Sequence, residues 1–597
     1  MCGISVIINK NNAAVELREI KTITDIVSHR GPDGEGFLLE NNFALGHRRL
    51  AIIDISADGD QPMWYENKYA IVFNGEIYNY LDIKSDLEKL GKTFKTKSDT
   101  EVILIAYECW GNDCIKRFNG MWSFCLYDKK KNILFCSRDR FGVKPFYYID
   151  GIDSFVFGSE IKQLLPYAKM TVNKKVLLEY LVLHLEEQSD ETFFEGIKKL
   201  QPSHNLVYDL KTHKTHIERY YSLEYKPEIG KLNIDDAILQ CKTDLIDAIK
   251  LRLRSDVEVG TCLSGGLDSS SIAAIAAKEF KLGTNFKGIH AKSTEKYTDE
   301  SHFAQMVADA GNINIVYTEP SEDYFKTHIE ALTLIQEEPI GGPSVFMQYA
   351  VFEKAKQEGC IVMLDGQGGD ETLLGYERYF PSLLNDVSFF RKITEMFKYS
   401  RKSRLSFVTV LMYYFYFKFP VLRIKRLLMK YNFIKKEYLK SIDTSILDEL
   451  ANAYKSPFEL QKIELTRTQL PHLLKYEDRN SMAHSIESRL PFLDYRSVEN
   501  AVSFNPEFKI NDGWSKFILR KATTEYLLEE IGWRRNKRGF ESPRTWLNDK
   551  NYFMSVIKES FILSKITIKI DNELSEEVIW KLFSIAIWEK KFDVKME

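Results

Sequence analysis

"VEVGTCLSGGLDSSSIAAIAAKEF", residues 257–280, is the stretch that decides the fold of the larger part of this chain. Its β-branched start predicts a buried strand over 257–263, and its alanine-rich end predicts a helix from Ser269. The join between them holds two glycines, an acid and four serines. Glycines let the backbone approach a ligand, and a helix N-terminus offers N–H groups and a positive dipole end to an anion. The stretch therefore predicts a phosphate-binding loop.

Two well-known nucleotide loops do not fit this join. It lacks the lysine of a Walker A loop, and its glycines do not have the G-x-G-x-x-G spacing of a dinucleotide site. A plain tight turn with serine caps is the structural alternative. The coincidence of glycines, an acid and hydroxyls at the end of a strand favours the phosphate-binding interpretation.

The residues that follow continue the alternation of strand and helix. Apolar runs bounded by turn residues alternate with segments whose apolar residues lie three and four apart, which is typical of a doubly wound parallel sheet. The predicted strands cover 286–292, 313–319 and 360–366; the predicted helices cover 301–311 and two stretches that end near Gly359.

The residues before this region have a different pattern. Short β-rich runs dominate 1–210, and helical spacing interrupts them only over 16–29 and 100–110, which indicates an α+β layered domain. Residues 211–232 carry Pro, Gly and mixed charge without periodicity and are the expected linker. A second domain is expected over 233–597, with Asn233 as the N-cap of its first helix.

The last third, from residue 382, reads as mostly helical, with a helical excursion expected over 382–460. Its segment 391–430 is basic and aromatic. This segment could touch a membrane surface or a partner, but a solvated basic face is the favoured interpretation. The apolar run Ser406–Phe417 has 12 residues, fewer than the roughly 20 that span a bilayer, so it predicts a buried helix.

Composition excludes several classes of protein. The 597 residues are 44% hydrophobic and 28% charged, as in ordinary folded proteins, and 82 basic against 85 acidic residues give a formal net charge of −3. This balance predicts small-molecule substrates, no nucleic-acid partner and no membrane contact. The first predicted strand starts without a charged and apolar leader pattern before it, so secretion is not expected.

The eight cysteines contain no C-x-x-C pair and are too sparse for a disulfide framework, so a reducing, cytoplasmic setting is expected. They are Cys2, Cys109, Cys114, Cys125, Cys136, Cys241, Cys262 and Cys360. Cys2 is unusual because it stands next to Met1, where chain ends are usually exposed, whereas an ordinary buried cysteine is inert.

Several ordered motifs resemble known families. "SGGLDSS" resembles the pyrophosphate loop of the ATP pyrophosphatases, and "MCGI", "RGPDGEG", "GHRRLAIID", "FNGEIYNY", "SDTEVI" and "SRDRFGVKP" have the order and spacing of a class II glutamine amidotransferase domain. With "HSIESRLPFLD" and "KFILRKA", the chain resembles the glutamine-hydrolysing asparagine synthetase family over nearly its whole length. The resemblance implies an αββα N-terminal nucleophile glutaminase domain followed by an ATP pyrophosphatase-type synthetase domain.

For the glutaminase domain, the resemblance implies Cys2 as nucleophile once Met1 is removed. Its α-amine could then act as the base, because an α-amino group titrates near 7.7 to 8.0. The resemblance also implies an oxyanion hole and a glutamine site. The oxyanion hole is Asn74 and Gly75; the glutamine ligands are Arg49, Asn74, Glu76 and Asp99.

For the synthetase domain, the resemblance implies Lys516 over the phosphates and the intermediate, and Asp268 and Asp370 as Mg2+ ligands. Hard carboxylate oxygens suit that ion. Arg489 and Glu487 could be site residues or structural ones. The implied ATP-binding residues are Leu263, Ser264, Gly265, Gly266, Leu267, Asp268, Ser269, Ser270, Asp365, Gly366 and Gln367.

Gln367 departs from the family pattern, which often has a glutamate there as the base for ammonia attack. An amide cannot accept a proton at neutral pH, so the base is elsewhere, such as Asp365 or a phosphate oxygen, or the acceptor is another carboxylate.

The expected reaction is ATP-driven amidation of aspartate to asparagine through β-aspartyl-AMP, with glutamine as nitrogen donor. The alternatives are amidation of a sugar or peptide carboxylate, and a catalytically inactive binding or assembly protein. A homodimer is possible.

Overall fold

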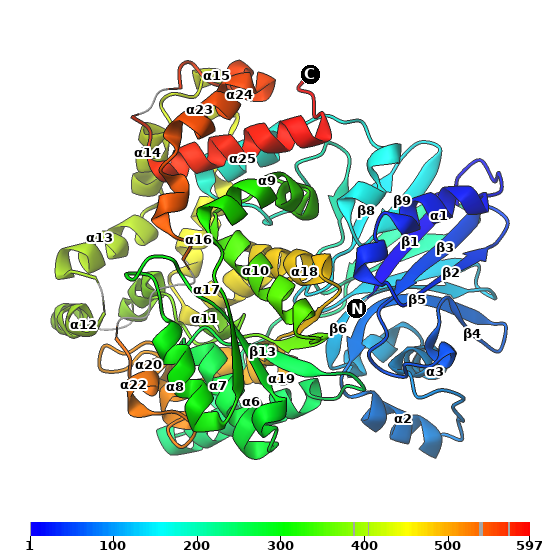
Figure 1. Ribbon diagram of the computed structural model, residues 1–597, viewed down its shortest axis with the longest axis horizontal. Helices are drawn as coiled ribbons and strands as arrows, with labels where there is room; N and C mark the ends of the chain where they lie inside the picture. The colour runs from blue at the N-terminus through cyan, green and yellow to red at the C-terminus, as the bar shows by residue number, and fades with distance from the viewer. Residues whose placement is uncertain (1, 386–387, 404, 536–540, 571–572) are drawn as a thin grey trace.

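The computed structural model describes residues 2–385, 388–403, 405–535, 541–570 and 573–597. Two six-stranded antiparallel sheets form the N-terminal part (Figure 1). In order, the first sheet contains β10 (Lys198–Lys199), β8 (Tyr147–Asp150), β9 (Ser154–Gly158), β1 (Gly3–Asn9), β3 (Phe43–Arg49) and β2 (Gly34–Leu39). The second contains β12 (Lys214–Arg219), β11 (His204–Asp209), β7 (Ile133–Arg138), β6 (Gly120–Asp128), β5 (Tyr69–Ile77) and β4 (Met63–Tyr65).

The side-chain alternation of strand β1 explains how these layers pack. Ile4, Val6 and Ile8 share one core with residues of both sheets, whereas Ile7 belongs to a cluster that includes helix α1 (Leu17–Asp25). On the other side, α2 (Tyr80–Lys89) and α3 (Asp99–Trp110) pack in a cluster with the second sheet. The layers are therefore helix, sheet, sheet, helix, which confirms the predicted αββα domain.

A five-stranded parallel sheet forms the centre of the second part. Neighbouring strands are all parallel, and helices from two separate hydrophobic clusters pack on the sheet, which confirms the doubly wound prediction. The strand order is β15 (Asn314–Thr318), β14 (Lys287–Ala291), β13 (Val259–Cys262), β16 (Val362–Leu364) and β17 (Glu487–Arg489). The helices are α6 (Ile234–Arg252), α7 (Leu267–Glu279), α8 (Ser301–Gly311), α9 (Glu322–Gln336) and α10 (Ser344–Gln357).

Asn233 is the N-cap of α6, as predicted: its side chain accepts a hydrogen bond from the Asp236 amide at 3.0 Å. The strand before this junction, β12, ends at Arg219. The domain limits at residues 210 and 233 stay a prediction.

The last third is mostly helical, as predicted. The helix α18 (Leu470–Ala483) lies at its centre, and Figure 1 shows α25 (Glu576–Phe592) along one side of the molecule. The remaining longer helices are α12 (Phe389–Lys402), α13 (Phe407–Lys418), α14 (Pro420–Lys430), α16 (Ser445–Ala453), α17 (Pro457–Ile463), α19 (Tyr495–Ser503) and α23 (Lys550–Glu559). Its short helices are α15 (Lys436–Ser441), α20 (Pro506–Lys509), α21 (Phe517–Ala522), α22 (Glu529–Gly532) and α24 (Phe561–Ile566). Earlier in the chain, the short helices are α4 (Lys174–Leu178), α5 (Pro227–Gly230) and α11 (Gly369–Thr372).

The prediction of a buried helix over Ser406–Phe417 is wrong. In α13 only Val410 is buried, because the helix packs at the edge of the molecule, far from the antiparallel sheets in Figure 1. Among the described residues, no single helix has the length and hydropathy to cross a membrane. The pair α13 and α14 meets that test together, but its two helices are bent by 102°.

Candidate active sites

Cys2 lies at the start of strand β1, buried between the two parts of the protein. Its backbone nitrogen lies 3.0 Å from Oδ1 of Asn74, and its carbonyl accepts a hydrogen bond of 3.0 Å from Nε of Arg30. Burial raises the pKa of the Cys2 thiol above its ordinary value. The resting sulfur is thus a thiol that needs a proton acceptor before it can attack. Met1, whose removal was predicted, lies outside the described residues.

Strand β5 brings the predicted oxyanion-hole residues beside Cys2. Nδ2 of Asn74 is buried and has no hydrogen-bond partner among the residues that the structure describes. At Gly75, an added Cβ would lie 2.1 Å from the carbonyl oxygen of Met121 on the adjacent strand, so no other residue fits. A buried amide donor without a partner is costly unless a ligand completes it, so Asn74 is arranged to receive an acceptor atom next to the thiol.

An excess of carboxyl groups surrounds one arginine on the other side of this site. Arg489 contacts Glu487 at 2.5 Å and Glu76 at 3.5 Å. Burial raises the pKa of Glu76 well above its usual range and the pKa of Asp99 to about 6. Burial also opposes ionisation of Glu487, but Arg489 holds its pKa below the ordinary value. Three acids against one cation leave this corner suited to a second cation.

Arg49 lies across the same cavity. Its guanidinium donates to the carbonyl of Ser56 at 2.6 Å and to Asp60 at 2.8 Å. The cavity is narrow, with a volume of about 30 Å³. The structure therefore brings together most of the predicted glutaminase residues in one lining: Cys2, Arg49, Gly75, Glu76 and Asp99. Glu487, from the second part of the chain, also lines this cavity.

The glycine-rich loop of the synthetase part follows strand β13, as predicted. Gly265 has φ +73°, and a Cβ there would lie 2.8 Å from the Ala304 amide nitrogen of helix α8. Gly266 is the N-cap of α7, so the first N–H groups of this helix face the end of the loop. Oγ of Ser264 and Oγ of Ser269 lie 2.8 Å apart and close the loop on itself.

Lys516 joins the two predicted metal ligands. Its Nζ lies 2.7 Å from both carboxylate oxygens of Asp268 and 2.6 Å from Oδ1 of Asp370. Lys516 is only 3% exposed and has φ +52° at the start of α21. Two carboxylates from the first turns of different helices, α7 and α11, therefore converge on one cation position.

A cavity of about 340 Å³ lies beside these carboxylates, at the carboxyl ends of the parallel strands. Gly265, Leu267 and Ser270 do not line it; Leu267 belongs to the core, and Oγ of Ser270 is buried. Its lining includes most of the predicted ATP-binding residues: Leu263, Ser264, Gly266, Asp268, Ser269, Asp365, Gly366 and Gln367. Asp370, predicted as a metal ligand, lines it too.

Two buried acids, Asp365 and Glu477, lie close together at this cavity. Asp365 was predicted as a site residue, but its pairing with Glu477 was not. Burial raises the pKa of Asp365 to about 6, and burial raises the pKa of Glu477 well above its usual range. Glu477 also accepts hydrogen bonds from Gln348 and Ser488. Glu477 could have been suspected from the sequence, because charged residues follow one another there in an otherwise apolar segment.

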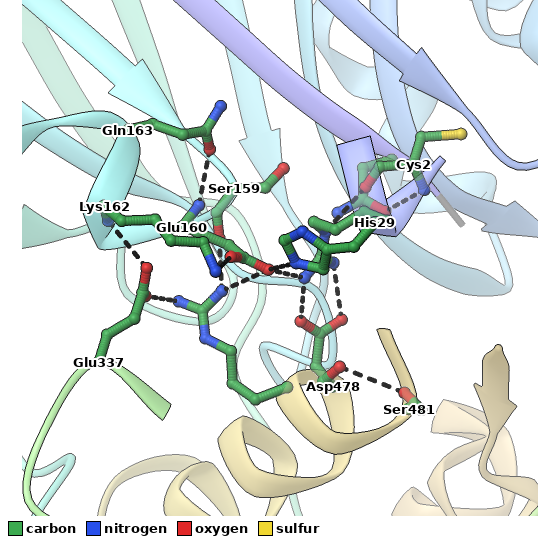
Figure 2. A network of polar contacts seen from close by, with 12 residues as sticks. Cys2, His29, Ser159, Glu160, Lys162, Gln163, Glu337, Asp478 and Ser481 are labelled. Atoms are coloured by element: carbon green, nitrogen blue, oxygen red, sulfur yellow. Dashed lines mark hydrogen bonds and ion pairs between the residues drawn. The ribbon is translucent and has the colours of Figure 1, made fainter. Parts of the chain in front are cut away.

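A network of charged residues between the two parts was also missed (Figure 2). Arg30, which holds the Cys2 carbonyl, donates to Asp478 at 2.8 and 3.0 Å and to Glu160 at 2.9 Å. Arg479 in turn contacts Glu160 at 3.1 Å. All of these side chains are buried, so the nucleophile is connected to helix α18 of the synthetase part.

Comparison with known proteins agrees with this geometry. Residues 1–221 match the family described as "Glutamine amidotransferase domain", and residues 240–581 match the family described as "Asparagine synthase".

Three relatives illustrate the range of similar proteins. A putative glutamine-hydrolyzing asparagine synthetase 2 of Methanocaldococcus jannaschii is 39% identical, with 67% of this chain and 79% of the relative covered. The glutamine-hydrolyzing asparagine synthetase 3 of Bacillus subtilis is 32% identical, with 90% and 86% covered. The protein named amidase chry2 of Gibberella zeae is 28% identical, with 91% and 89% covered.

Proposed function

Because this chain belongs to the glutamine-hydrolysing asparagine synthetase family, an ATP-dependent ligase family, we propose that it converts aspartate to asparagine. In the proposed reaction the β-carboxylate of aspartate attacks the α-phosphorus of ATP, which forms β-aspartyl-AMP and releases pyrophosphate. Ammonia from glutamine then displaces AMP. The observation that carries the proposal is that the chain contains two sites. One gathers residues suited to glutamine hydrolysis, and the other gathers residues suited to ATP binding and adenylate formation.

In the glutaminase half, Cys2 is the proposed nucleophile and its α-amine the proposed base. The raised thiol pKa supports this pairing, because a thiol must lose its proton before it attacks the glutamine amide. Nδ2 of Asn74 and the Gly75 N–H are proposed to stabilise the tetrahedral oxyanion. The proposal requires removal of Met1, which the intact mass of the active protein tests. Retention of Met1 in a glutamine-using enzyme would contradict it.

Arg49, Glu76 and Asp99 are proposed to bind the amino-acid end of glutamine. Asp60, the present carboxylate partner of Arg49, is more than half exposed and can give way to the substrate α-carboxylate. The surplus of acid around Arg489 suits the α-ammonium group.

In the synthetase half, the glycine-rich loop and α7 are proposed to bind the ATP phosphates. Asp268 and Asp370 fit a Mg2+ site, since both are hard oxygen ligands that already converge on the Lys516 ammonium. The ion, when bound, would neutralise phosphate charge. Lys516 is proposed to orient the phosphates and to stabilise the charge that develops on the leaving pyrophosphate.

Asp365 is the proposed proton acceptor during ammonia attack. Gln367 lines the same cavity but cannot accept a proton, whereas Asp365 has a pKa near 6 and lies beside it. A group with a pKa close to neutrality suits general-base work.

An acceptor screen tests the proposed function. Purified protein with glutamine and ATP is given aspartate or other acids, and AMP, pyrophosphate and the amide product are measured. Aspartate-dependent formation of AMP and asparagine in equal amounts is expected. If no acid supports pyrophosphate release, the proposal is wrong.

A second candidate is the same chemistry on a different carboxylate. Gln367 and the similarity to a protein named as an amidase favour it, and the screen separates it from asparagine synthesis by the acid consumed. A catalytically inactive protein is disfavoured by Cys2, Asn74, Asp268 and Asp370. The proposed location is the cytoplasm, because all eight cysteines are free thiols.

A further inference from the structure

The largest cavity described here lies outside both active sites. It has a volume of about 710 Å³, within the range of small-molecule sites and twice the volume of the synthetase cavity. Its walls come from the helical excursion, α13 and α14, from α16 and α18, and from residues 183–185 of the glutaminase part. Neither half-reaction uses it.

The charges on the lining of this cavity are unbalanced. Arg378 pairs with Glu464 at 2.6 Å, and Lys430 pairs with Glu577 at 2.6 Å. Two further lining arginines, Arg423 and Arg426, make no ion pair with any residue that the structure describes. Two cations without an ion-pair partner among the described residues therefore lie at this cavity, half-buried Arg423 and exposed Arg426, and their positive potential attracts an anion.

The uncompensated cations lie over aromatic rings. The guanidinium groups of Arg423 and Arg426 each lie 5.6 Å from the ring centre of Tyr416. In the same lining, Tyr454 has a buried hydroxyl and Arg423 a buried Nε, neither with a hydrogen-bond partner among the described residues. Aromatic faces pack against rings, and buried polar atoms without partners indicate missing ligand atoms. Charge, ring faces and hydroxyl donors together suit a polar ring that carries an anion.

Two contacts, one cation–π and one edge-to-face, connect this cavity to the synthetase cavity. Arg378 on one side lies 4.5 Å from the ring centre of Tyr376 on the other, and the ring centres of His472 and Tyr476 are 6.1 Å apart. The first residue of each pair lines the larger cavity, and the second lines the synthetase cavity. A ligand that contacts Arg378 or His472 therefore acts on a wall of the reaction site.

We propose that this cavity binds a sugar ring bearing a phosphate or carboxylate, with the anion on Arg423 and Arg426 and the ring against Tyr416. The site goes beyond the proposed function and does not depend on which acid accepts the nitrogen. Such a ligand binds here without reaction, because the cavity lies outside both active sites, and it can carry either anion. The shared chemistry is what the cavity recognises.

Calorimetric titration of the full chain tests the site with four probes. Glucose 1-phosphate and glucuronic acid 1-phosphate carry both ring and anion, methyl glucoside carries the ring alone, and inorganic phosphate carries the anion alone. The two sugar phosphates are expected to bind at least about tenfold more tightly than either half. If inorganic phosphate binds as tightly as the sugar phosphates, or if neither sugar phosphate binds, the proposal is wrong.

Variants locate the binding. The double change Arg423→Ala and Arg426→Ala should weaken sugar-phosphate binding by about tenfold or more, because two charge-assisted contacts are lost. Lys425→Ala is the matched control: Lys425 is an exposed cation on the same helix α14 but does not line the cavity, so less than about twofold change is expected. Tyr416→Leu, which removes no charge, should also weaken binding. Equal losses in Lys425→Ala and in the double variant would place the binding elsewhere.

Activity keeps this inference distinct from the proposed function. A rate of aspartate-dependent pyrophosphate release that changes with glucose 1-phosphate, and no longer changes in the double variant, supports the site. Sugar-phosphate binding and amide formation from glucuronic acid 1-phosphate that the double variant retains unchanged would place the ligand in the synthetase cavity and contradict the site. Glutamine hydrolysis and aspartate-dependent pyrophosphate release are measured in the same preparation without sugar phosphate. Their absence contradicts the proposed function alone, and loss of probe binding contradicts the cavity site alone.

Discussion

Asn74 allows the proposed oxyanion hole to be tested apart from the position of the nucleophile. Its two side-chain atoms do different work: Oδ1 lies 3.0 Å from the Cys2 nitrogen, and Nδ2 has no partner among the described residues. Asn74→Ala removes both atoms. Asn74→Asp keeps an oxygen near the Cys2 nitrogen and replaces only the donor with a second oxygen.

The expected losses follow from these contacts. Loss of one oxyanion-hole donor typically lowers kcat by about 10² to 10³, or about 2.7 to 4 kcal/mol, and Asn74→Ala should fall in this range. Asn74→Asp should be more impaired, because a buried carboxylate repels the developing oxyanion and favours the protonated form of the Cys2 amine. If Asn74 only held Cys2 in place, Asn74→Ala would lose more glutaminase activity than Asn74→Asp. The oxyanion-hole role predicts the reverse order.

Glutamate release from glutamine is the assay, and AMP formation with added ammonia is the control. Both variants should retain ammonia-driven AMP formation, because Asn74 lies in the glutaminase part. If Asn74→Asp hydrolyses glutamine at close to the wild-type rate, Nδ2 does not stabilise the transition state and the assignment of the oxyanion hole is refuted.

Four further outcomes are expected. Cys2→Ala should abolish glutamine hydrolysis and leave synthesis from ammonia intact; loss of both in a folded variant would show that the two half-reactions are not divided as proposed. Asp268→Ala and Asp370→Ala should each suppress ATP-dependent pyrophosphate release by about 10²-fold or more and spare glutaminase activity, because each removes a carboxylate from the Lys516 cation position; unchanged pyrophosphate release would remove them from the site. Gln367→Glu should raise the rate of amide formation from aspartate, because a general base typically contributes about 10² to 10⁴-fold, whereas a lower rate would favour a different acceptor. Burial raises the pKa of Asp99 to about 6, so the folded protein binds this proton more tightly than the unfolded chain, and Asp99 lowers the free energy of unfolding as the pH rises from about 4 to 6. Asp99→Asn should therefore increase the free energy of unfolding at pH 7, measured by chemical denaturation, and should raise KM for glutamine. An unchanged KM would contradict the glutamine-binding role.

Local patterns predicted the framework because the deciding signals are short-range. The strand, glycine loop and helix at 257–280 occur as expected, and so do the strands and helices that alternate after α7. The β-rich runs of the first part also predicted its layers, since period-two alternation fixes which side chains face the core.

Long-range pairings were not predictable from local patterns. Arg30 and Asp478 are 448 positions apart, and nothing in the sequence near either residue indicates the other. Strand β17 has only three residues, too few for a periodic signal, yet it places Arg489 beside Glu76. The exposure of α13 was missed for a related reason: twelve apolar-rich residues predict burial unless the packing surface is known.

From the bond between Arg30 and Asp478 we expect glutamine hydrolysis to depend on an intact synthetase half. The Cys2 carbonyl is held by a guanidinium whose buried counter-charge belongs to helix α18, so an isolated N-terminal half would leave that arginine without one of its acids. The same bond supplies buried Asp478 on helix α18 with a counter-charge from the first half. A fragment released by proteolysis or by premature termination of synthesis would thus carry a misplaced thiol, and the cell would be spared an enzyme that wastes glutamine without making an amide.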